Sequence, residues 1–363
     1  MYEKNAILTI EQEILLLNEL FLDAKTNFVI KDCLYGLELM EIELSKTIDI
    51  NIWIKPDDIN DAYKNILPKY AYEFPNKSDY FDIFLKSGIF FDNYYRNFFE
   101  KVINEIEETN LLEGDLPVAL AFDTNLYFNL MFNQLTDLFN KRFQSPPYLI
   151  NFLCSVGVKK ELTGYEWKYK GNDIEEMKEI CKEPEIVNNF FNQNKFKSRL
   201  WHLGHVDYLD SIESTQSKII DIDKTIETDD MDCMILEGLV DYINQQNIKL
   251  YLYSEDSDFI SRAKGNPNVI PVFLEKIPFH KLNSRLSCEW EQLAKLLYVL
   301  SITFGAIKLE FEKTTLIMYG IWKGKKYHHW LDKSIKIVSE DNIINNIKKD
   351  LRILKNLKFK EVV

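Results

Sequence analysis

Four acidic residues stand where their side chains could meet at one edge of a folded sheet. Carboxylates held that close together disfavour one another's ionisation unless a cation lies between them. Hard divalent ions such as Mg²⁺ and Mn²⁺ prefer carboxylate and water oxygens, so the set predicts a site for one or two of these ions. The four are Asp123 after the apolar run VALAF, Glu161 at the end of the β-like stretch SVGVKKEL, Asp232 at the start of a helical pattern, and Asp256 after LYLYS.

The chemistry that these ligands support is hydrolysis of a phosphodiester bond, and we expect the four acids to be catalytic. Two ions about 4 Å apart would clamp the attacking and leaving oxygens of an in-line displacement, and the metal lowers the pKa of its own water. Asp258 is a fifth candidate metal ligand. Thr124 and Ser254 could orient carboxylates or waters, and together with Asn125 and Lys160 they are the candidate substrate-binding residues.

Each of these positions also has a structural interpretation. An acid that follows a strand can cap the next helix or form a turn, and an acid near a helix start can balance the helix dipole. Asp229 and Asp230 compete with Asp232 for the third acidic position. His202 and His205 lie three residues apart, but no third ligand accompanies them, so packing or surface roles are favoured over zinc binding.

Strands that alternate with helices must position these residues. VALAF, IKLYLYS and VIPVFLE are short continuous apolar runs, as expected of strands buried on both faces of a sheet. Helical patterns such as LYFNLMFNQLTDLFNKRF and DFISRAKG lie between them. The alternation predicts an α/β fold with a mainly parallel sheet, and sites in such sheets form beyond the carboxyl ends of the strands.

The flanking regions have other patterns. Residues 1–115 contain stretches with apolar residues at three- and four-residue steps, which predicts a helical N-terminal region. Residues 281–363 show a helix, a β-meander and a final helix, which predicts a small mixed α+β region. The α/β domain is expected between them at residues 116–280, and either flank could bind a protein partner or a second copy of the chain.

The ordered motifs FDTN, VKKEL, DCMILEGL and YSEDSDF resemble those of the PIN-domain nucleases, over roughly residues 117–275. The resemblance implies an α/β/α sandwich and metal-dependent cleavage of single-stranded or structured RNA. It also implies that the acids of these motifs form the active site. The chain departs from the family pattern between Glu161 and Asp232, where an insertion around residues 170–228 is expected to form a cap or a docking surface.

Composition limits the other possibilities. The net charge of −13 does not suit a protein that binds nucleic acid over its whole surface, but local basic strips remain available. The candidate strips are Lys159 with Lys160, KFKSR at 195–199, WKGKKYHH at 322–329 and the C-terminal KKDLRILKNLKFK. Tyr327, Trp330 and Lys326 could form a platform for RNA bases.

The compartment follows from two absences in the sequence. The five cysteines show no paired spacing, and no run of apolar residues is long enough to span a membrane. We therefore expect a cytoplasmic protein without a membrane anchor.

Three rival functions remain open. The first is a non-catalytic module on the same scaffold that binds RNA or protein, which the large flanking regions favour. The second is a structure-specific nuclease that acts on DNA. The third is an aspartyl phosphotransferase with Asp123 as its nucleophile, but such enzymes usually carry a second Asp where this chain has Asn125.

Overall fold

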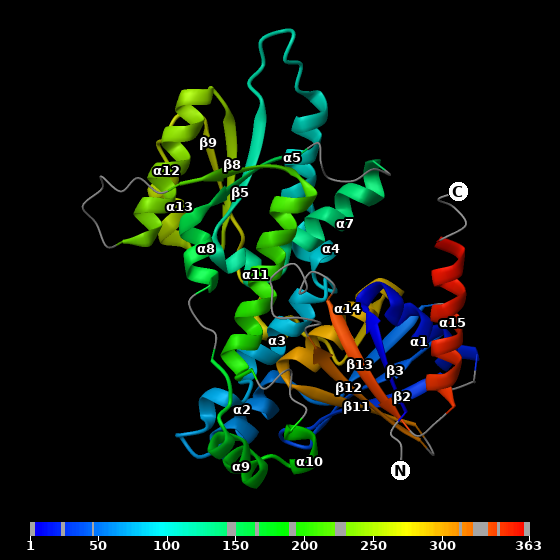
Figure 1. Cartoon of the computed structure of the whole chain (residues 1–363). Helices are drawn as coiled ribbons and strands as arrows, with labels where there is room; N and C mark the ends of the chain where they lie inside the picture. The colour runs from blue at the N-terminus through cyan, green and yellow to red at the C-terminus, as the bar shows by residue number, and fades with distance from the viewer. Residues whose placement is uncertain are drawn as a thin grey trace. The chain divides into compact units, whose positions relative to one another are not determined.

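The computed structural model divides the chain into two compact units, which are described separately (Figure 1). The parallel-sheet unit comprises residues 90–166 and 200–278, and the antiparallel-sheet unit comprises residues 1–89, 167–199 and 279–363. The structure describes residues 4–22, 26–45, 47–143, 150–163, 167–188, 194–221, 230–311, 314–321, 333–339 and 342–358.

The parallel-sheet unit contains a five-stranded sheet in which all strands run in the same direction. The strand order is β7-β6-β5-β8-β9, so β5 is central and the chain moves outward from it first on one side and then on the other. The carboxyl ends of β5 and β8 therefore flank the point where the strand order reverses, where α/β sheets form their binding sites. The strands are β5 (Val118–Phe122), β6 (Asn151–Ser155), β7 (Gln216–Ile220), β8 (Lys249–Ser254) and β9 (Val269–Phe273).

Helices cover both faces of this sheet (Figure 1). On one face, the ring of Phe99 stacks on Tyr253 and meets the edge of Phe122. On the other face lie α12 and α13, where β5 presents the small residues Ala119 and Ala121. The helices are α4 (Phe91–Tyr94), α5 (Arg96–Glu108), α6 (Thr124–Phe128), α7 (Met131–Phe143), α8 (Val156–Thr163), α12 (Met231–Gln246) and α13 (Ser257–Ala263), with α11 (Phe196–Ser214) beginning in the other unit.

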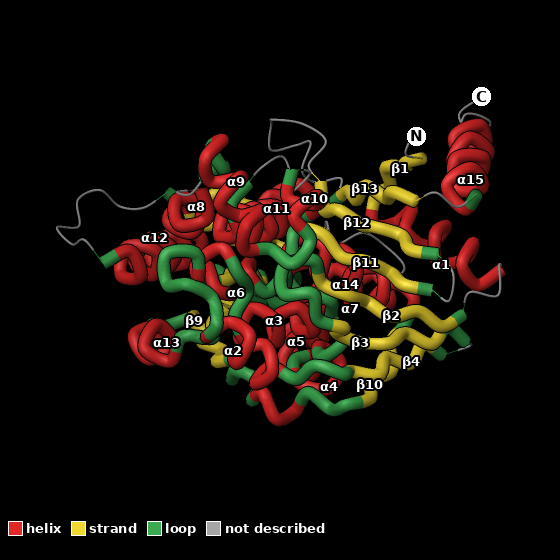
Figure 2. Tube along the Cα trace, turned by 90° about the horizontal axis from the view of Figure 1, so that it is seen from below, coloured by secondary structure: helices red, strands yellow, loops and turns green. Residues whose placement is uncertain are grey.

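The antiparallel-sheet unit contains an eight-stranded sheet in the order β1-β13-β12-β11-β2-β3-β4-β10 (Figure 2). Its strands alternate between a buried and a more exposed face, as in β4, where Ile48, Ile50 and Ile52 are buried and Asp49 and Asn51 are half-buried. The strands are β1 (Lys4–Thr9), β2 (Asn27–Asp32), β3 (Glu38–Glu43), β4 (Ile48–Ile52), β10 (Arg285–Cys288), β11 (Ala306–Glu310), β12 (Thr315–Ile321) and β13 (Ser334–Ser339).

The apolar helix α14 (Trp290–Thr303) packs against the strands of this sheet and against α3, and its residues from Leu296 to Thr303 are all buried. Short 3-10 helices lie at Ile10–Gln12, Ala71–Glu73 and Phe279–Lys281. The remaining helices are α1 (Glu13–Leu22), α2 (Pro56–Lys64), α3 (Lys77–Lys86), α9 (Gly171–Ile180), α10 (Pro184–Val187) and α15 (Ile343–Lys358). Within the described residues, no helix combines the length and the apolar character needed to cross a membrane.

The mixed α/β fold with a parallel sheet agrees with the sequence analysis, but the flanking regions differ from it. The region 1–115, which was predicted to be helical, contains α1 to α5 but also β1 to β4, which were not predicted. Residues 281–363 are not a separate region, because their strands complete the same sheet. Of the expected insertion at 170–228, residues up to Arg199 belong to the antiparallel-sheet unit and those from Leu200 belong to the parallel-sheet unit.

Two shorter predictions in the parallel-sheet unit also need correction. The stretch SVGVKKEL is not β-like beyond Ser155, because β6 ends there and α8 begins at Val156. The strand β9 is not buried on both faces, since it lies at the edge of the sheet and its residues are half-buried or exposed. Because β9 pairs with only one of the described strands, β8, its apolar residues are less covered than those of a central strand.

Candidate functional site

Asp123 lies at the carboxyl end of β5 and is the N-cap of α6. Its side chain is only 6% exposed, and its Oδ1 accepts a hydrogen bond from the backbone N–H of Thr124 at 2.7 Å. Its Oδ2 accepts from the Ser254 hydroxyl at 2.6 Å and from the Asn125 amide at 2.9 Å. The carboxylate is therefore buried and oriented by three donors.

Ser254 connects the ends of the two central strands. Its hydroxyl donates to Asp123 and accepts a hydrogen bond from the backbone N–H of Asp256 at 2.8 Å. The Asn125 amide also lies 3.3 Å from the Ser254 Oγ, and its carbonyl accepts from the backbone N–H of Glu255 at 3.3 Å. These contacts join the loop after β5 to the loop after β8, and Ser254 and Asn125 both hold the carboxylate of Asp123.

Glu161 reaches the same region from α8. The hydroxyl of Thr124 donates a hydrogen bond to Glu161 Oε2, so Thr124 orients the second acid while its backbone N–H binds the first. Glu161 is half-buried, and burial together with the charge of Asp232 raises its pKa. It is the sixth residue of α8 rather than the residue that opens the helix, because VGVKKEL continues directly from β6 as helix.

Asp232 lies in the first turn of α12, whereas Asp230 is the N-cap of that helix. Asp230 accepts hydrogen bonds from the backbone N–H groups of Asp232 at 3.1 Å and Cys233 at 3.4 Å. It also forms an ion pair with Arg262 at 2.6 Å. The charge of Asp230 is thus already balanced by Arg262, which favours Asp232 as the third acid. The other competitor, Asp229, lies outside the described residues.

Asp256 is the N-cap of α13 and accepts hydrogen bonds from the backbone N–H groups of Asp258 at 2.7 Å and Phe259 at 3.1 Å. The side chains of Asp256 and Asp258 are both exposed. Glu255 points elsewhere: it is buried, and its Oε1 accepts a hydrogen bond from the Asn129 amide at 2.8 Å. The three adjacent acids of YSEDSDF therefore have three different environments.

Three of the four predicted acids, Asp123, Glu161 and Asp232, have pKa values that neighbouring acids help to raise. The pKa of Asp123 is raised to about 6, mainly by burial and to a smaller extent by the charges of Asp232 and Glu161, against the opposing hydrogen bonds from Ser254 and Thr124. Burial also raises the pKa of Asp232, with added contributions from the charges of Asp230 and Asp256. Asp232 is thus near enough to affect both Asp123 and Glu161, and Asp256 is near enough to affect Asp232.

These oxygen ligands suit Mg²⁺ or Mn²⁺ in their chemistry, since neighbouring carboxylates that raise each other's pKa gain from a cation. Within the described residues, however, no three His, Cys, Asp or Glu side chains stand together in an arrangement that could hold a metal ion. Capping contacts hold Asp123 and Asp256, and Thr124 holds Glu161. To bind a metal ion together, these acidic side chains would have to rotate and break some of these hydrogen bonds.

The remaining candidates have varied surroundings. Lys160 and its neighbour Lys159 are exposed on α8. His202 and His205 are buried in α11, and burial with the charge of Lys159 lowers the pKa of His205 to about 4. The proposed base-stacking residues at 326–330 lie outside the described residues.

Arg262 and Asn129, which hold Asp230 and Glu255 in place, were not identified from the sequence. The three acids in YSEDSDF lie so close together that some of them need a hydrogen-bond donor or a cation as a partner. The neighbouring sequence does not indicate which residues supply these partners. Both partners come from other segments of the chain.

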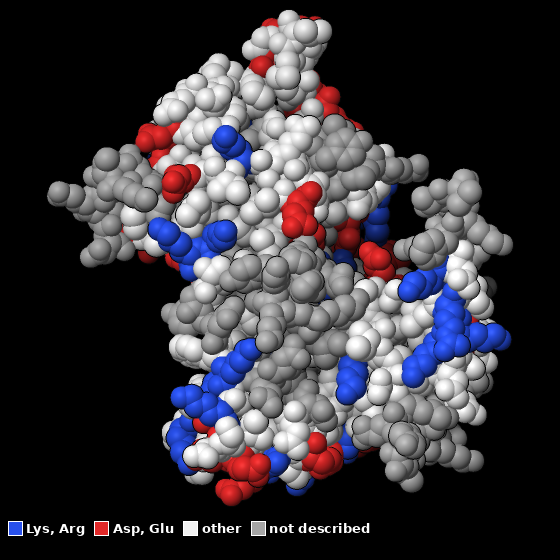
Figure 3. Space-filling model, viewed as in Figure 1, with Lys and Arg blue, Asp and Glu red and all other residues white. Residues whose placement is uncertain are grey.

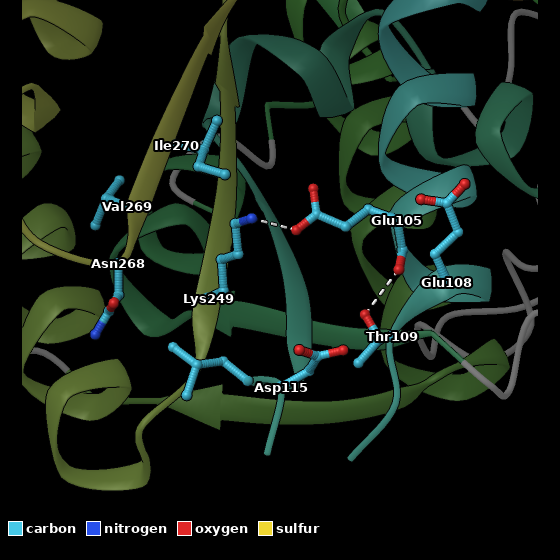
Figure 4. Close-up of a pocket in the computed structure, with 9 residues that line it drawn as sticks. Glu105, Glu108, Thr109, Asp115, Lys249, Asn268, Val269 and Ile270 are labelled. Carbon is cyan, nitrogen blue, oxygen red and sulfur yellow. Dashed lines mark hydrogen bonds and ion pairs between the residues drawn. The ribbon is translucent and has the colours of Figure 1, made fainter. Parts of the chain in front are cut away.

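A pocket of about 650 Å³ lies at the opposite end of the same sheet (Figure 4). Asp115, which precedes β5, and Lys249, which begins β8, both line it. Lys249 and the hydroxyl of Tyr251 bind Glu105 there. Because it adjoins the amino ends of the strands, this pocket does not include the four acids.

In comparisons with known proteins, no family model, curated protein or solved structure matches this chain. The function of the protein is therefore inferred from its residues and their geometry.

Proposed function

We propose that the chain is a PIN-like, metal-dependent endoribonuclease whose active site lies at the carboxyl ends of β5 and β8. The observation that supports this most strongly is that Thr124 joins Asp123 to Glu161 and Ser254 joins Asp123 to Asp256 where the strand order reverses, with Asp232 near enough to raise the pKa of Asp123 and Glu161. Perturbed carboxylates at such a position are typical of functional sites. RNA as the substrate rests on the resemblance of the ordered motifs to PIN-domain nucleases.

In this proposal the four acids would hold Mg²⁺ or Mn²⁺, with Asp258 as an outer ligand. The bound ion would supply a water of lowered pKa as the nucleophile. Ser254 and Asn125 hold the carboxylate of Asp123, and Thr124 holds that of Glu161. Lys160 is exposed and adjacent to Glu161, so its ammonium group is available to a substrate phosphate.

The first test is cleavage of RNA by the variants Asp123→Asn and Asp256→Asn in the presence of Mn²⁺. Each substitution removes a negative charge from the site while it preserves the size of the side chain. We expect each to lower the cleavage rate by roughly a hundredfold or more, since even residues that only orient a metal ligand contribute about 10- to 100-fold. Asp241→Asn, which changes an exposed acid of α12, is the matched control. A double variant that cuts at the parental rate would refute the proposal.

A second candidate is a PIN-like module that binds RNA or protein without cleaving it. The capping contacts of Asp123 and Asp256 favour this alternative, because both carboxylates are already satisfied without a metal. Thermal melting with Mn²⁺ distinguishes the two, since a ligand at a hundred times its Kd stabilises the fold by about 2.7 kcal/mol. If the chain is the nuclease, Mn²⁺ should raise the Tm of the parent and leave the Tm of Asp123→Asn unchanged. An unchanged Tm for both would favour the non-catalytic module.

A further inference from the structure

The C-terminal helix α15 has one face committed to packing. Ile343, Ile344 and Ile347 are buried, and the helix packs against α1 and β1 of the antiparallel-sheet unit. Its sequence IINNIKKDLRILKNLK contains five basic residues and a single acid, in a chain with a net charge of −13. The charge of this helix is therefore opposite in sign to that of the whole protein.

Lys348, Arg352 and Lys355 follow one another at steps of four and three residues, so they form one stripe along the helix. All three are exposed, as is Lys349 beside them. The single acid, Asp350, is half-buried and projects from nearly the opposite side of the helix, given about 100° of rotation per residue. Figure 3 shows basic side chains gathered over this helix. We call Lys348, Lys349, Arg352 and Lys355 the basic stripe.

Several exposed cations of the protein have acidic partners, whereas the members of the basic stripe, like Lys159 and Lys160, have none among the described residues. Arg96 binds Glu100, Arg285 binds Asp49, and Lys178 binds Glu175. In the part of the chain that the structure describes, no ion pair includes a member of the stripe. Like charges four residues apart on a helix are destabilising, and the helix dipole favours cations only in the last turn. Folding alone does not explain the stripe.

We propose that the basic stripe is a docking surface for the phosphate backbone of single-stranded RNA. The choice of RNA rests on the proposed function, and the charge of the stripe complements a polyanion with regularly spaced phosphates. A membrane surface would also attract cations, but an interfacial helix needs a free apolar face. In α15, Ile343, Ile344 and Ile347 already pack within the protein, and only Ile353 and Leu354 are exposed apolar residues among the described side chains of the helix. Two residues make a small apolar surface for an interfacial helix, so RNA is favoured.

The test is the affinity of the wild-type chain for a fluorescent oligouridylate in EDTA, measured over a series of salt concentrations. The variant Lys348→Gln/Arg352→Gln/Lys355→Gln replaces three cations with glutamine, which is neutral and favours helix formation. If each binds one phosphate, the slope of log K against log salt falls by about 2, because a single-strand contact contributes about 0.7. In 0.1 M salt this corresponds to a loss of affinity of up to roughly a hundredfold.

Two control proteins separate the stripe from general effects. Lys55→Gln/Lys64→Gln/Lys69→Gln makes the same change in net charge at exposed positions of the same unit and should bind RNA like the wild type. Lys348→Arg/Lys355→Arg keeps the charge and should also bind normally, which shows that the helix itself tolerates substitution. Equal losses in the stripe variant and the first control would overturn the proposal.

The remaining outcomes are also decisive. If the stripe variant loses binding to vesicles that contain phosphatidylserine but binds RNA normally, α15 docks on membranes and the proposal is wrong. Because binding is measured in EDTA, it does not depend on cleavage. A chain that binds oligouridylate through the stripe but never cuts RNA with Mn²⁺ would refute the nuclease and leave the docking surface intact.

Discussion

The carboxyl group of Asp123 combines almost complete burial with three hydrogen-bond donors and two nearby acids. Burial raises its pKa from 3.8 to about 6. A raised pKa means that the folded state binds the proton more tightly than the unfolded state does. The stabilisation from this proton is thus complete below about pH 4 and is lost as the pH rises through about 6.

The first prediction concerns the pH dependence of stability without divalent ions. Asp123→Asn replaces the carboxylate with a group that does not titrate. We expect the stability of this variant relative to the parent to rise between pH 4 and 7, by up to about 3 kcal/mol for a shift of roughly two pKa units. Urea unfolding at pH 4.5, 6 and 7.5 measures it. A difference that stays constant or falls with pH would contradict the raised pKa.

The second prediction concerns Ser254, whose hydroxyl lowers the pKa of Asp123 by donating to its carboxylate. Ser254→Ala removes this donor, so the pKa of Asp123 should rise and the pH–rate profile for RNA cleavage should move to higher pH. A loss of about 10- to 100-fold in rate at neutral pH is expected for a residue that orients a metal ligand. Ser257→Ala, which removes an exposed hydroxyl from α13, should leave the profile unchanged. A loss of rate with no change of profile would indicate a different role.

For single residues, the sequence predicts which side chains approach one another, but not which hydrogen bonds and ion pairs hold them in place. Asp123, Thr124, Asn125 and Ser254 follow two neighbouring strands, and all four meet there. The ion pair of Asp230 with Arg262 depends on how two helices pack on the sheet. Spacing along the chain carries no information about that packing.

The position of α8 against α12 fixes how Glu161 and Asp232 face each other. This close approach requires a glycine at position 157, because a Cβ atom there would lie 2.4 Å from Ile235 Cγ1. Ile235 is buried and cannot move aside freely. The glycine thus allows the two helices that carry two of the acids to touch.

The third prediction is that Gly157→Ala destabilises the protein by about 1–3 kcal/mol, as expected for overpacking in a core. It should also weaken Mn²⁺ binding, because α8 and α12 must separate. Gly171→Ala is the control, since a Cβ atom there would meet nothing within 4 Å. In the double variant with Ile235→Ala, the combined loss of stability should be smaller than the sum of the two single losses. Additive losses would show that the contact does not limit the helix spacing.

Helices and strands were predictable where one period dominates the pattern. β5 and the middle of β8 are continuous runs of apolar or aromatic residues, and α14 is apolar over several turns. SVGVKKEL misleads because V-x-V suggests alternation, although Val158 and Leu162 lie four residues apart on one helical face. In the N-terminal region, ELMEIE at Glu38–Glu43 contains the alternating pattern of a strand. The longer helical patterns in the same region led to the prediction of helix throughout.

At the scale of the whole molecule, the antiparallel sheet depends on pairings between the two ends of the chain. β1 pairs with β13, with Lys4 opposite Ser339, and β4 pairs with β10. No local pattern can specify partners that lie more than 200 residues apart. Three consecutive domains were therefore a reasonable prediction from the sequence, although the chain returns to the antiparallel-sheet unit twice.

Arg199 shows how one of these returning segments is held within the antiparallel-sheet unit. Its guanidinium is fully buried and donates to the backbone carbonyls of Ile302 at 2.8 Å and Thr303 at 3.2 Å, at the C-terminal end of α14. A third bond joins it to the carbonyl of Asn194 at 3.0 Å. The cation also suits the negative end of the helix dipole.

The final prediction is that Arg199→Met destabilises the antiparallel-sheet unit by about 3 kcal/mol or more, because buried carbonyls lose charged donors. Hydrogen exchange followed by mass spectrometry should show faster exchange in α14 and in residues 167–188, while β5 and β8 keep their protection. Arg285→Met changes an exposed arginine in the same unit and should have little effect, because exposed ion pairs contribute about 1 kcal/mol or less. Equal loss of protection in β5 and β8 would show that the two units unfold as one.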